Sequence, residues 1–394
     1  MNYILFDDTN RTNLFPLTFT RPTAEIRIGI LTIREKWEQY LGAKTSFLTE
    51  DYLSKKFPIA TAELNMLING SVCPTKELVD QIKELKPGQA LFKDEILIAD
   101  YLDSDSVISF DKESKDSEIV ETTSNFIYIA NTWDIFKYNA QAINDDFVLL
   151  TTGRKSHPIS DTNRCLNKEN IFIEEGAKVE FSILNASEGP IYIGAHAEVM
   201  EDCKIRGPFA LGEHAVLKMD AKIYGGTTIG PYSKVGGEVS NSVIFGYSNK
   251  AHDGFLGNSV LGEWCNLGAD TNTSNLKNNY EEVKLWSYAD ETFVPTGLQF
   301  CGLIMGDHSK SGINTMFNTG TIVGVSANVF GSGFPRNFIS SFSWGGAKGF
   351  IEFNIKKALK VAQAVYKRRN IEFSEQDRNI LEAVYEQTFA NRNL

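Results

Sequence analysis

One histidine, His252, interrupts the stretch NKAHDGFLGNSVLGEWCNLGADTNTSN, which spans residues 249–275. An imidazole titrates near neutral pH, so it can accept the proton that an attacking nucleophile loses. Hydrophobic positions recur here every six residues, and in the frame that begins at Asn249 the histidine takes the fourth position. We expect that position to face outward. Two readings follow from this placement: a general base, or a solvated surface histidine.

A second group of reactive side chains follows the apolar YILF near the start of the chain. Asp7 and Asp8 are candidates to hold Mg2+, because carboxylate oxygens are ligands that this ion prefers. Arg11 and Arg21, with Arg27, could meet the phosphates of a nucleoside triphosphate. The two aspartates would themselves repel phosphate, so this chemistry requires a rearranged site.

The elements that position these groups are set by a period of six. From Ile193 to Val235 every first position is aliphatic, and the register resumes at Val243 and again at Met305. Six residues do not fit the 3.6-residue period of a helix, but they fit a short flat strand followed by a turn. Three such sides make a triangular coil, and stacked coils hydrogen-bond as parallel strands.

This pattern resembles the hexapeptide-repeat proteins, whose fold is a left-handed parallel β-helix. The repeat covers about residues 171–334, with a break after Asn275 that carries Tyr280, Trp286 and Tyr288. This aromatic segment could cover a cofactor cleft or pack on a neighbouring subunit. The expected fold class is an α/β nucleotidyltransferase-like N-terminal domain, then the left-handed β-helix, then two C-terminal helices.

Residues 250–275 resemble the acetyltransferase half of the GlmU-like bifunctional N-acetylglucosamine-1-phosphate uridyltransferases. The family pattern is K-A-x-H, an aromatic residue with L-G-D, and N-x-G-A-G-T with a nearby Asn; this chain reads KAH, FLGN and NLGADT. Asp270 and Asn258 replace a glycine and an aspartate of that pattern. The resemblance implies that His252 is the general base for acetyl transfer from acetyl-CoA to an amino-sugar 1-phosphate, and that Asn275 positions the amine.

The same resemblance assigns groups to the substrates. It places Ala269, with Gly268 beside it, against acetyl-CoA, and Glu238 against the sugar. The family's phosphate-binding lysine is Ser240 here, and Lys222 or Arg206 on neighbouring coils could compensate for it. Lys250, from the K-A-x-H pattern, is a further substrate-binding candidate. A solvated outward side chain is the alternative for Glu238.

A rival use of the repeat is metal binding. His196 and His214 both occupy the fourth position of a hexad and lie 18 residues apart, which is one full coil of three hexads. We therefore expect them to stack on one face at the strand spacing. Gamma-class carbonic anhydrases, a related β-helix family, hold zinc with three histidines. Here the next stacked position is Tyr232, which favours an external polar ladder.

The N-terminal ILFDDTNRTNLFPLTFTRPT resembles the start of the sugar-nucleotide pyrophosphorylases, roughly ILAAGxGTRLxPLTxxxPK. MLINGS resembles their L-N-G-D motif, with Ser71 in the place of the magnesium-holding aspartate. The glycines that let backbone N–H groups approach a phosphate are replaced. We therefore expect the fold of this family with a reduced or rewired site. Whether that site transfers a nucleotide from UTP or dTTP to a sugar 1-phosphate is left undecided by the sequence.

The remaining segments indicate the boundaries. Thr75 is expected to cap a helix over PTKELVDQIKEL, and Ser374 with Asp377 to begin the second of two C-terminal helices. The apolar stripe of that second helix is Ile380, Leu381, Val384, Tyr385 and Phe389. The pair is expected to cover an open end or edge of the β-helix. We expect domains at 1–165, 171–345 and 346–394.

Composition limits the partners. The net charge of −11 argues against a nucleic-acid binder, since broad phosphate binding requires a basic face. Five scattered cysteines suggest neither a disulfide framework nor a zinc knuckle, and no apolar run is long enough to span a membrane. The expectation is a cytoplasmic homotrimer acting on sugar phosphates and nucleotides. A non-catalytic sugar-nucleotide-binding scaffold and a zinc-dependent gamma-carbonic-anhydrase-like enzyme are the alternatives.

Overall fold

The computed structural model describes residues 1–113 and 115–393, which form two compact units. The first contains Met1–Leu14, Thr20–Ile26 and Leu31–Asn131. The second contains Phe15–Phe19, Arg27–Ile30 and the chain from Thr132 onward. Among the described residues, no helix has both the length and the apolar character needed to cross a membrane.

The first unit is built on one six-stranded sheet in the order β2-β1-β3-β5-β4-β6. Strand β1 pairs in parallel with β2 on one side and with β3 on the other, whereas β5 runs antiparallel to β3 and β4. Because both parallel neighbours of β1 follow it in the chain, its carboxyl end is the point where ligands bind in open α/β sheets. The strands are β1 (Asn2–Phe6), β2 (Thr45–Leu48), β3 (Leu64–Asn69), β4 (Gln89–Lys93), β5 (Ile96–Asp103) and β6 (Glu118–Glu121).

Among the described residues, four α-helices accompany this sheet, and α1, α3 and α4 begin at a capping side chain. Thr75 accepts a hydrogen bond from the backbone N–H of Leu78 at 3.2 Å, so the predicted cap is confirmed. Thr32 forms a complete capping box with Glu35 at the start of α1. The helices are α1 (Ile33–Leu41), α2 (Asp51–Ser54), α3 (Lys76–Glu84) and α4 (Ser104–Ile108).

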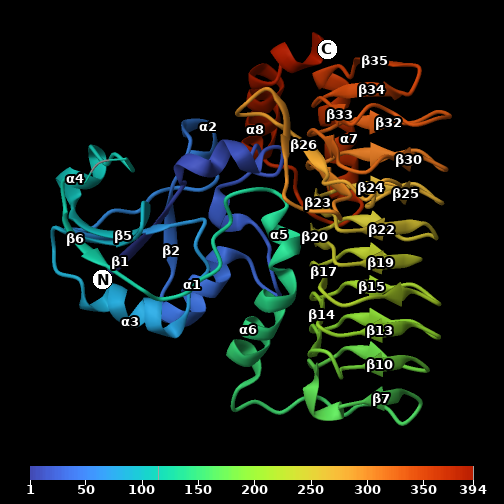
Figure 1. The fold of residues 1–394 in the computed structure, drawn as a ribbon, viewed down its shortest axis with the longest axis horizontal. Coiled ribbons are helices and arrows are strands. Elements are labelled where there is room, and N and C mark those ends of the chain that lie inside the picture. The colour runs from blue at the N-terminus through green and yellow to red at the C-terminus, as the bar shows by residue number, and fades with distance from the viewer. Residues whose placement is uncertain (114, 394) are drawn as a thin grey trace. The chain divides into compact units, whose positions relative to one another are not determined.

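The second unit contains a parallel β-helix whose short strands stack coil upon coil (Figure 1). Three sheets form its sides, called faces 1, 2 and 3 here. Face 1 consists of β7 (Arg164–Leu166), β10 (Ile183–Asn185), β13 (Lys204–Arg206), β16 (Lys222–Ile223), β19 (Glu238–Ser240) and β22 (Phe255–Gly257). Face 2 consists of β8 (Ile171–Ile173), β11 (Ile191–Ile193), β14 (Phe209–Leu211), β17 (Thr227–Ile229), β20 (Val243–Gly246), β23 (Val260–Glu263), β28 (Leu303–Met305), β31 (Thr321–Val323) and β33 (Phe338–Ile339).

Face 3 is the longest of the three sheets. It consists of β9 (Lys178–Val179), β12 (Glu198–Val199), β15 (Val216–Leu217), β18 (Lys234–Val235), β21 (Asn249–Lys250), β24 (Asn266–Leu267), β29 (Lys310–Ser311), β32 (Asn328–Val329), β34 (Ser343–Gly346) and β35 (Gly349–Glu352). Two small sheets complete the unit: β25 (Asn272–Thr273) with β30 (Met316–Phe317), and the hairpin of β26 (Lys284–Ser287) with β27 (Thr292–Pro295). The hairpin lies in the break that the sequence shows between hexads.

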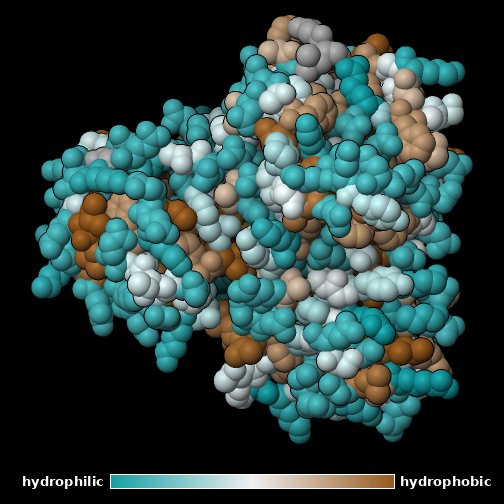
Figure 2. Space-filling view, viewed as in Figure 1, coloured by the Kyte–Doolittle hydropathy of each residue, from teal (hydrophilic) through white to brown (hydrophobic). Residues whose placement is uncertain are grey.

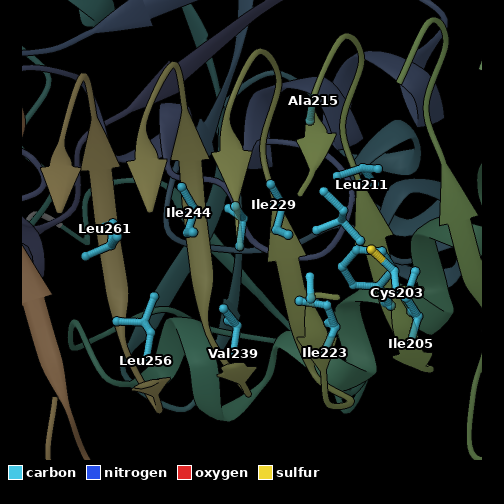
Figure 3. Close-up of a cluster of buried hydrophobic side chains, with 14 of the residues drawn as sticks. Cys203, Ile205, Leu211, Ala215, Ile223, Ile229, Val239, Ile244, Leu256 and Leu261 are labelled. Atoms are coloured by element: carbon cyan, nitrogen blue, oxygen red, sulfur yellow. The ribbon is translucent and has the colours of Figure 1, made fainter. Parts of the chain in front are cut away.

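Most inward positions of the coils hold apolar side chains, which form one buried cluster, as the repeat predicts. In Figure 3 the side chains of Ile205, Leu211, Ile223 and Ile229 point into the interior from successive strands. Turn residues at the fourth position adopt left-handed backbone angles, with φ of 55° at His196 and 61° at Asp202. His, Asn and Asp tolerate that region better than most residues do, which explains their recurrence there. The predicted left-handed parallel β-helix is confirmed.

The register around His252 was predicted one residue out. Ile223 pairs with Val239, and Val235 pairs with Lys250, so Lys250 rather than Asn249 takes the inward position. The corners are shorter here because Gly237 and Asn241 turn the chain with positive φ angles of 71° and 43°. The inward residues of these coils are accordingly Ile244, Lys250 and Leu256, not Val243, Asn249 and Phe255.

Helices α5 (Asp134–Lys137) and α6 (Asn139–Thr151) precede the coils, and α7 (Ile355–Lys367) and α8 (Glu375–Gln387) follow them. The two predicted C-terminal helices are confirmed, including the capping box of Ser374 with Asp377. Tyr366 of α7 stacks on Trp264 with ring centroids 4.0 Å apart, so this helix packs against the side of the coils. Phe389, predicted on the apolar stripe of α8, is 59% exposed because the helix ends two residues earlier.

Candidate functional site

His252 lies at the corner where the chain passes from face 3 to face 1, and its side chain is exposed there. It lines an open cleft of about 610 Å³ on the side of the coils. The other lining residues are Met200, Lys218, Met219, Gly236, Gly237, Ala251, Asp253, Ala269 and Asp270. The histidine therefore faces outward, as predicted, although it takes the third position of its hexad, counted from the inward Lys250, rather than the fourth.

Small residues on adjacent coils make room beside the imidazole. Gly236 and Gly237 come from the coil before His252, and Ala269 comes from the coil after it. A Cβ atom on Gly237 would lie 2.9 Å from the Cα of Asp253, and the φ of 71° is one that side chains rarely adopt. Glycine is thus required at this position to let the His252 corner approach so closely.

Lys250, expected to contact substrate, is instead buried at 2% exposure. Its Nζ donates a hydrogen bond of 2.5 Å to the carbonyl oxygen of His252. Burial lowers the pKa of Lys250 to about 8, and the carboxylates of Asp253 and Asp270 oppose that shift. In the structure this lysine therefore contacts the backbone of His252 and does not line the cleft.

Glu238 and Lys222 lie side by side on face 1, since their strands pair at these two residues. The half-buried Phe255 is the next member of the same outward row. Lys222 is exposed, and its Nζ lies 3.7 Å from a carboxylate oxygen of Asp220. A hydrogen bond from Lys204 lowers the pKa of Asp220, so that carboxylate competes with any phosphate for the two lysines.

Asn275 lies at the other edge of face 1 from His252. Its Nδ2 donates to Oδ1 of Asn258 at 2.8 Å, and Asn258 makes the turn after β22. Gly257 leaves room for the Asn275 amide and the Phe255 ring, which would lie 2.7 and 2.5 Å from a Cβ there. The structure thus does not bring Asn275 into the His252 cleft. Strand β22, with Phe255 on its outer side, separates the two predicted catalytic residues.

Gly268 and Ala269 occupy the corner that follows His252 by one coil. Ala269 lines the cleft, and Gly268 packs against the backbone of Gly312, 2.5 Å from where its Cβ would lie. Lys218 and Met219, which the sequence interpretation omitted, come from the coil before Gly236 and Gly237, eighteen residues earlier. The 18-residue stacking period does not lead from His252 to them, because Val235 and Lys250 pair only fifteen residues apart.

His196 and His214 stack with ring centroids 5.0 Å apart, as predicted. His214 stacks in turn on Tyr232 at 4.8 Å, and the ladder continues through Tyr247 and Trp264. No group of three or more histidine, cysteine, aspartate or glutamate side chains suited to a metal ion occurs among the described residues. These observations favour the external ladder.

In the first unit, Asp7 and Arg11 form a buried ion pair at the carboxyl end of β1, with 3.1 Å between Oδ2 and Nε. The other oxygen of Asp7 accepts the backbone N–H of Thr23 at 2.7 Å. Arg11 also donates to the hydroxyl of Tyr52 at 2.8 Å. The rigid segment that contains the predicted Arg21, which is also buried, is thereby tied to the first strand.

Asp8 accepts hydrogen bonds from Asn69 and Tyr128, at 2.9 and 2.5 Å. Neighbouring donors therefore surround both predicted magnesium ligands, and Ser71 supplies no carboxylate. This donor set does not fit a Mg2+ ion, which requires unprotonated oxygen ligands directed at one point. A magnesium site in this unit stays a prediction from the sequence alone.

A cleft of about 570 Å³ opens beside these residues at the ends of β1 and β2. Thr49, Glu50, Tyr52 and Lys112 line it together with Asp7. The Nζ of Lys112 lies 3.3 Å from the carbonyl oxygen of Asp7, so this lysine places a positive charge at the strand end. Sequence interpretation missed Tyr52 and Lys112 because neither belongs to a motif.

Comparisons with known proteins agree with both halves of the prediction. The family model for sugar nucleotidyl transferase matches residues 3–155. The bifunctional protein GlmU of Methanocaldococcus jannaschii is 34% identical over 87 residues, which cover 22% of this chain and 21% of that protein. The bifunctional sugar-1-phosphate nucleotidylyltransferase/acetyltransferase of Sulfurisphaera tokodaii is 32% identical over 100 residues, covering 25% of this chain and 24% of that protein. The predicted resemblance to GlmU-like proteins is confirmed, over about a quarter of their length.

Among solved structures, the Arabidopsis UDP-N-acetylglucosamine acyltransferase is similar at 14% identity with a TM-score of 0.29. That match covers 56% of this chain and 80% of the other. The corresponding acyltransferase of Campylobacter jejuni matches at 16% identity with a TM-score of 0.25, over 58% of this chain and 95% of that one.

Proposed function

We propose that this chain, whose residues 3–155 match the sugar nucleotidyl transferases, acts in the synthesis of sugar nucleotides and carries an acetyltransferase site on its β-helix. The proposed reaction is acetyl transfer from acetyl-CoA to the amine of an amino-sugar 1-phosphate. The observation that carries this proposal is the exposed His252 in an open cleft lined by Gly236, Gly237 and Ala269. That cleft offers a base with space beside it for two substrates.

His252 would act as the general base. The amine nitrogen attacks the thioester carbonyl, a C–N bond forms, and the C–S bond breaks to release the thiolate. The imidazole nitrogen accepts the proton that the amine nitrogen loses. Acetyl-CoA supplies the acetyl group, and the small side chain of Ala269 leaves room for it on the adjoining coil.

The outward row on face 1 would hold the sugar. Glu238 can accept hydrogen bonds from hydroxyl groups, while Lys222, with Lys218 inside the cleft, supplies positive charge for the phosphate. Asn275 lies at the far edge of β22 from His252. To contact both residues, the sugar phosphate would have to lie across Phe255. Asp220 competes for Lys222, which predicts modest rather than tight phosphate binding.

The test is to incubate the protein with acetyl-CoA and glucosamine 1-phosphate and to follow release of free thiol. His252→Ala should lower turnover by about 10²-fold or more, because a positioned base contributes that much. The matched control is His214→Ala, which removes an equally exposed histidine outside the cleft. Equal turnover of His252→Ala and the wild type would return His252 to a solvated surface residue and favour the non-catalytic scaffold.

A second activity is favoured by the family match and by the cleft at the end of β1. We propose that the first unit binds a nucleotide or sugar phosphate there, with Arg11 and Arg21 near the phosphates. Binding must compete with the buried Asp7–Arg11 pair, so weak nucleotidyl transfer is expected.

Its test mixes the protein with Mg2+, UTP or dTTP and a hexose 1-phosphate, and measures pyrophosphate. We expect little release, together with measurable calorimetric heat from the nucleotide. Steady release that is lost in Arg21→Ala would contradict that expectation and make both units catalytic. No heat from any nucleotide would leave the first unit as a scaffold.

A further inference from the structure

A second cleft on the β-helix unit lies under the hairpin β26–β27, away from His252. It has a volume of about 590 Å³ and is lined by Lys277, Lys284, Trp286, Phe293, Arg336 and Phe338, among others. The hairpin interrupts the hexads and is not needed to continue the coils, because β23 pairs directly with β28 across the interruption. The segment therefore adds a surface that the repeat itself lacks.

Aromatic rings form the floor of this hairpin cleft. Trp286 stacks on Phe338 with centroids 4.4 Å apart and planes 16° from parallel. Phe293 meets Trp286 edge-on at 5.4 Å, and its ring is 41% exposed. The buried Nε1 of Trp286 has no hydrogen-bond partner among the described residues. The exposed Phe293 beside the Trp286 ring suits a planar ligand that stacks on aromatic side chains.

The charges around these rings are all positive. Lys277, Lys284 and Arg336 line the cleft, and no carboxylate does. This contrasts with the whole chain, in which 50 acidic residues outnumber 39 basic ones. It also contrasts with the cleft at the end of β1, which Asp7 and Glu50 line. Three cations without an acid indicate an anionic ligand, and guanidinium and ammonium groups are the usual partners of phosphates.

We propose that the hairpin cleft binds an adenine nucleotide with more than one phosphate group. The base would lie against Phe293 and Trp286, and the phosphates would lie among the three cations. Such a ligand has two sources: a free nucleotide such as ATP, or the 3′-phospho-ADP end of coenzyme A. The second source rests on the proposed acetyltransferase function. The hairpin would then contribute to holding the acetyl donor.

Isothermal titration of the full chain tests this proposal with four probes: ATP, adenosine 3′,5′-bisphosphate, coenzyme A and phosphopantetheine. We expect heat from the three nucleotides and none at this site from phosphopantetheine, which lacks the base. Lys284→Glu should weaken nucleotide binding about tenfold or more, since it reverses one of three charges at an exposed position. The control is Lys178→Glu, an equally exposed lysine on the first coils.

Phe293→Ala provides a second variant at an exposed ring, and it should weaken the same binding while the unfolding transition is unchanged. Competition between ATP and coenzyme A for one site would assign both sources to the cleft; binding of ATP alone would support a free nucleotide. Equal affinity of Lys284→Glu, Phe293→Ala and the wild type would overturn the proposal. The two proposals are tested separately by His252→Ala. This variant should lose thiol release, whereas its calorimetric heat of nucleotide binding should equal that of the wild type.

Discussion

Lys250 lies at an inward position that the neighbouring coils fill with Val235 and Leu267. Its stem replaces an aliphatic side chain, and its ammonium group reaches the carbonyl oxygen of His252. At the scale of single residues, the candidate base is therefore held from inside the coil as well as from its corner. A buried cation of this kind costs stability, which makes the arrangement measurable.

The first prediction concerns this lysine and pH. Its folded-state pKa of about 8 lies below the unfolded value of 10.5, so the unfolded chain binds more protons between these values. The stability contribution of Lys250 should rise as the pH increases from 8 toward 10, by roughly 1 kcal/mol at pH 9. Denaturant unfolding at pH 7 and pH 9 measures it.

Lys250→Met provides the reference, because other groups also titrate above pH 8. The difference in unfolding free energy between the wild type and this variant should move in favour of the wild type as the pH rises. A difference that stays constant from pH 7 to pH 9 would show that the ammonium group is not buried as described.

At the scale of elements, the corner between faces 3 and 1 is shaped by a glycine. Gly237 lies in a shortened corner, where the inward residues Val235 and Val239 are four residues apart rather than six, and it allows the His252 corner to pack closely. The three faces are instead stabilised by their inward residues, which stack from coil to coil in parallel register. The cleft therefore depends on one irregular corner in an otherwise regular stack of coils.

The second prediction is that Gly237→Ala lowers both stability and acetyl transfer. The added Cβ meets the Cα of Asp253 at 2.9 Å, and the left-handed angle adds strain, so we expect a loss of about 1–3 kcal/mol. Gly42→Ala is the matched control, with a φ of 65° and open space around its Cβ. If the two variants lost equal stability and Gly237→Ala kept full turnover, the close approach would have no functional role.

At the scale of the whole molecule, assembly would use coil faces other than face 2, on which α6 packs against β14 and β17. On the side drawn in Figure 2, hydrophobic residues occur in small separate groups among hydrophilic ones. Prisms of this kind can assemble around a threefold axis through their flat sides. Such an assembly would bring a second chain to the edges of face 1, where His252 and Asn275 lie.

The third prediction is a homotrimer. A chain of 44.0 kDa should then give a mass near 132 kDa, three times that value, in light scattering at micromolar concentration. Acetyl transfer should fall on dilution below the assembly range if a neighbouring copy completes the site. A mass of 44.0 kDa with full activity would assign the entire site to one chain.

The sequence alone predicted the inward positions of the coils, two helix caps and one pair of stacked rings. The aliphatic positions from Ile193 to Val235, the caps at Thr75 and Ser374, and the stacking of His196 on His214 all follow from periods and short-range hydrogen bonds. Each depends on residues close in sequence or related by one fixed coil length. For that reason a count along the chain predicts them.

Only the tertiary structure shows where counting along the six-residue repeat gives the wrong position. The inward placement of Lys250 follows from a shortened corner, and a period cannot predict where a turn loses a residue. The separation of His252 from Asn275 by β22 likewise required the coil geometry. The capture of Asp7 by Arg11 and Thr23 depends on a chain that folds back on its first strand. These contacts are set by packing in three dimensions, where burial determines which partner satisfies each charge.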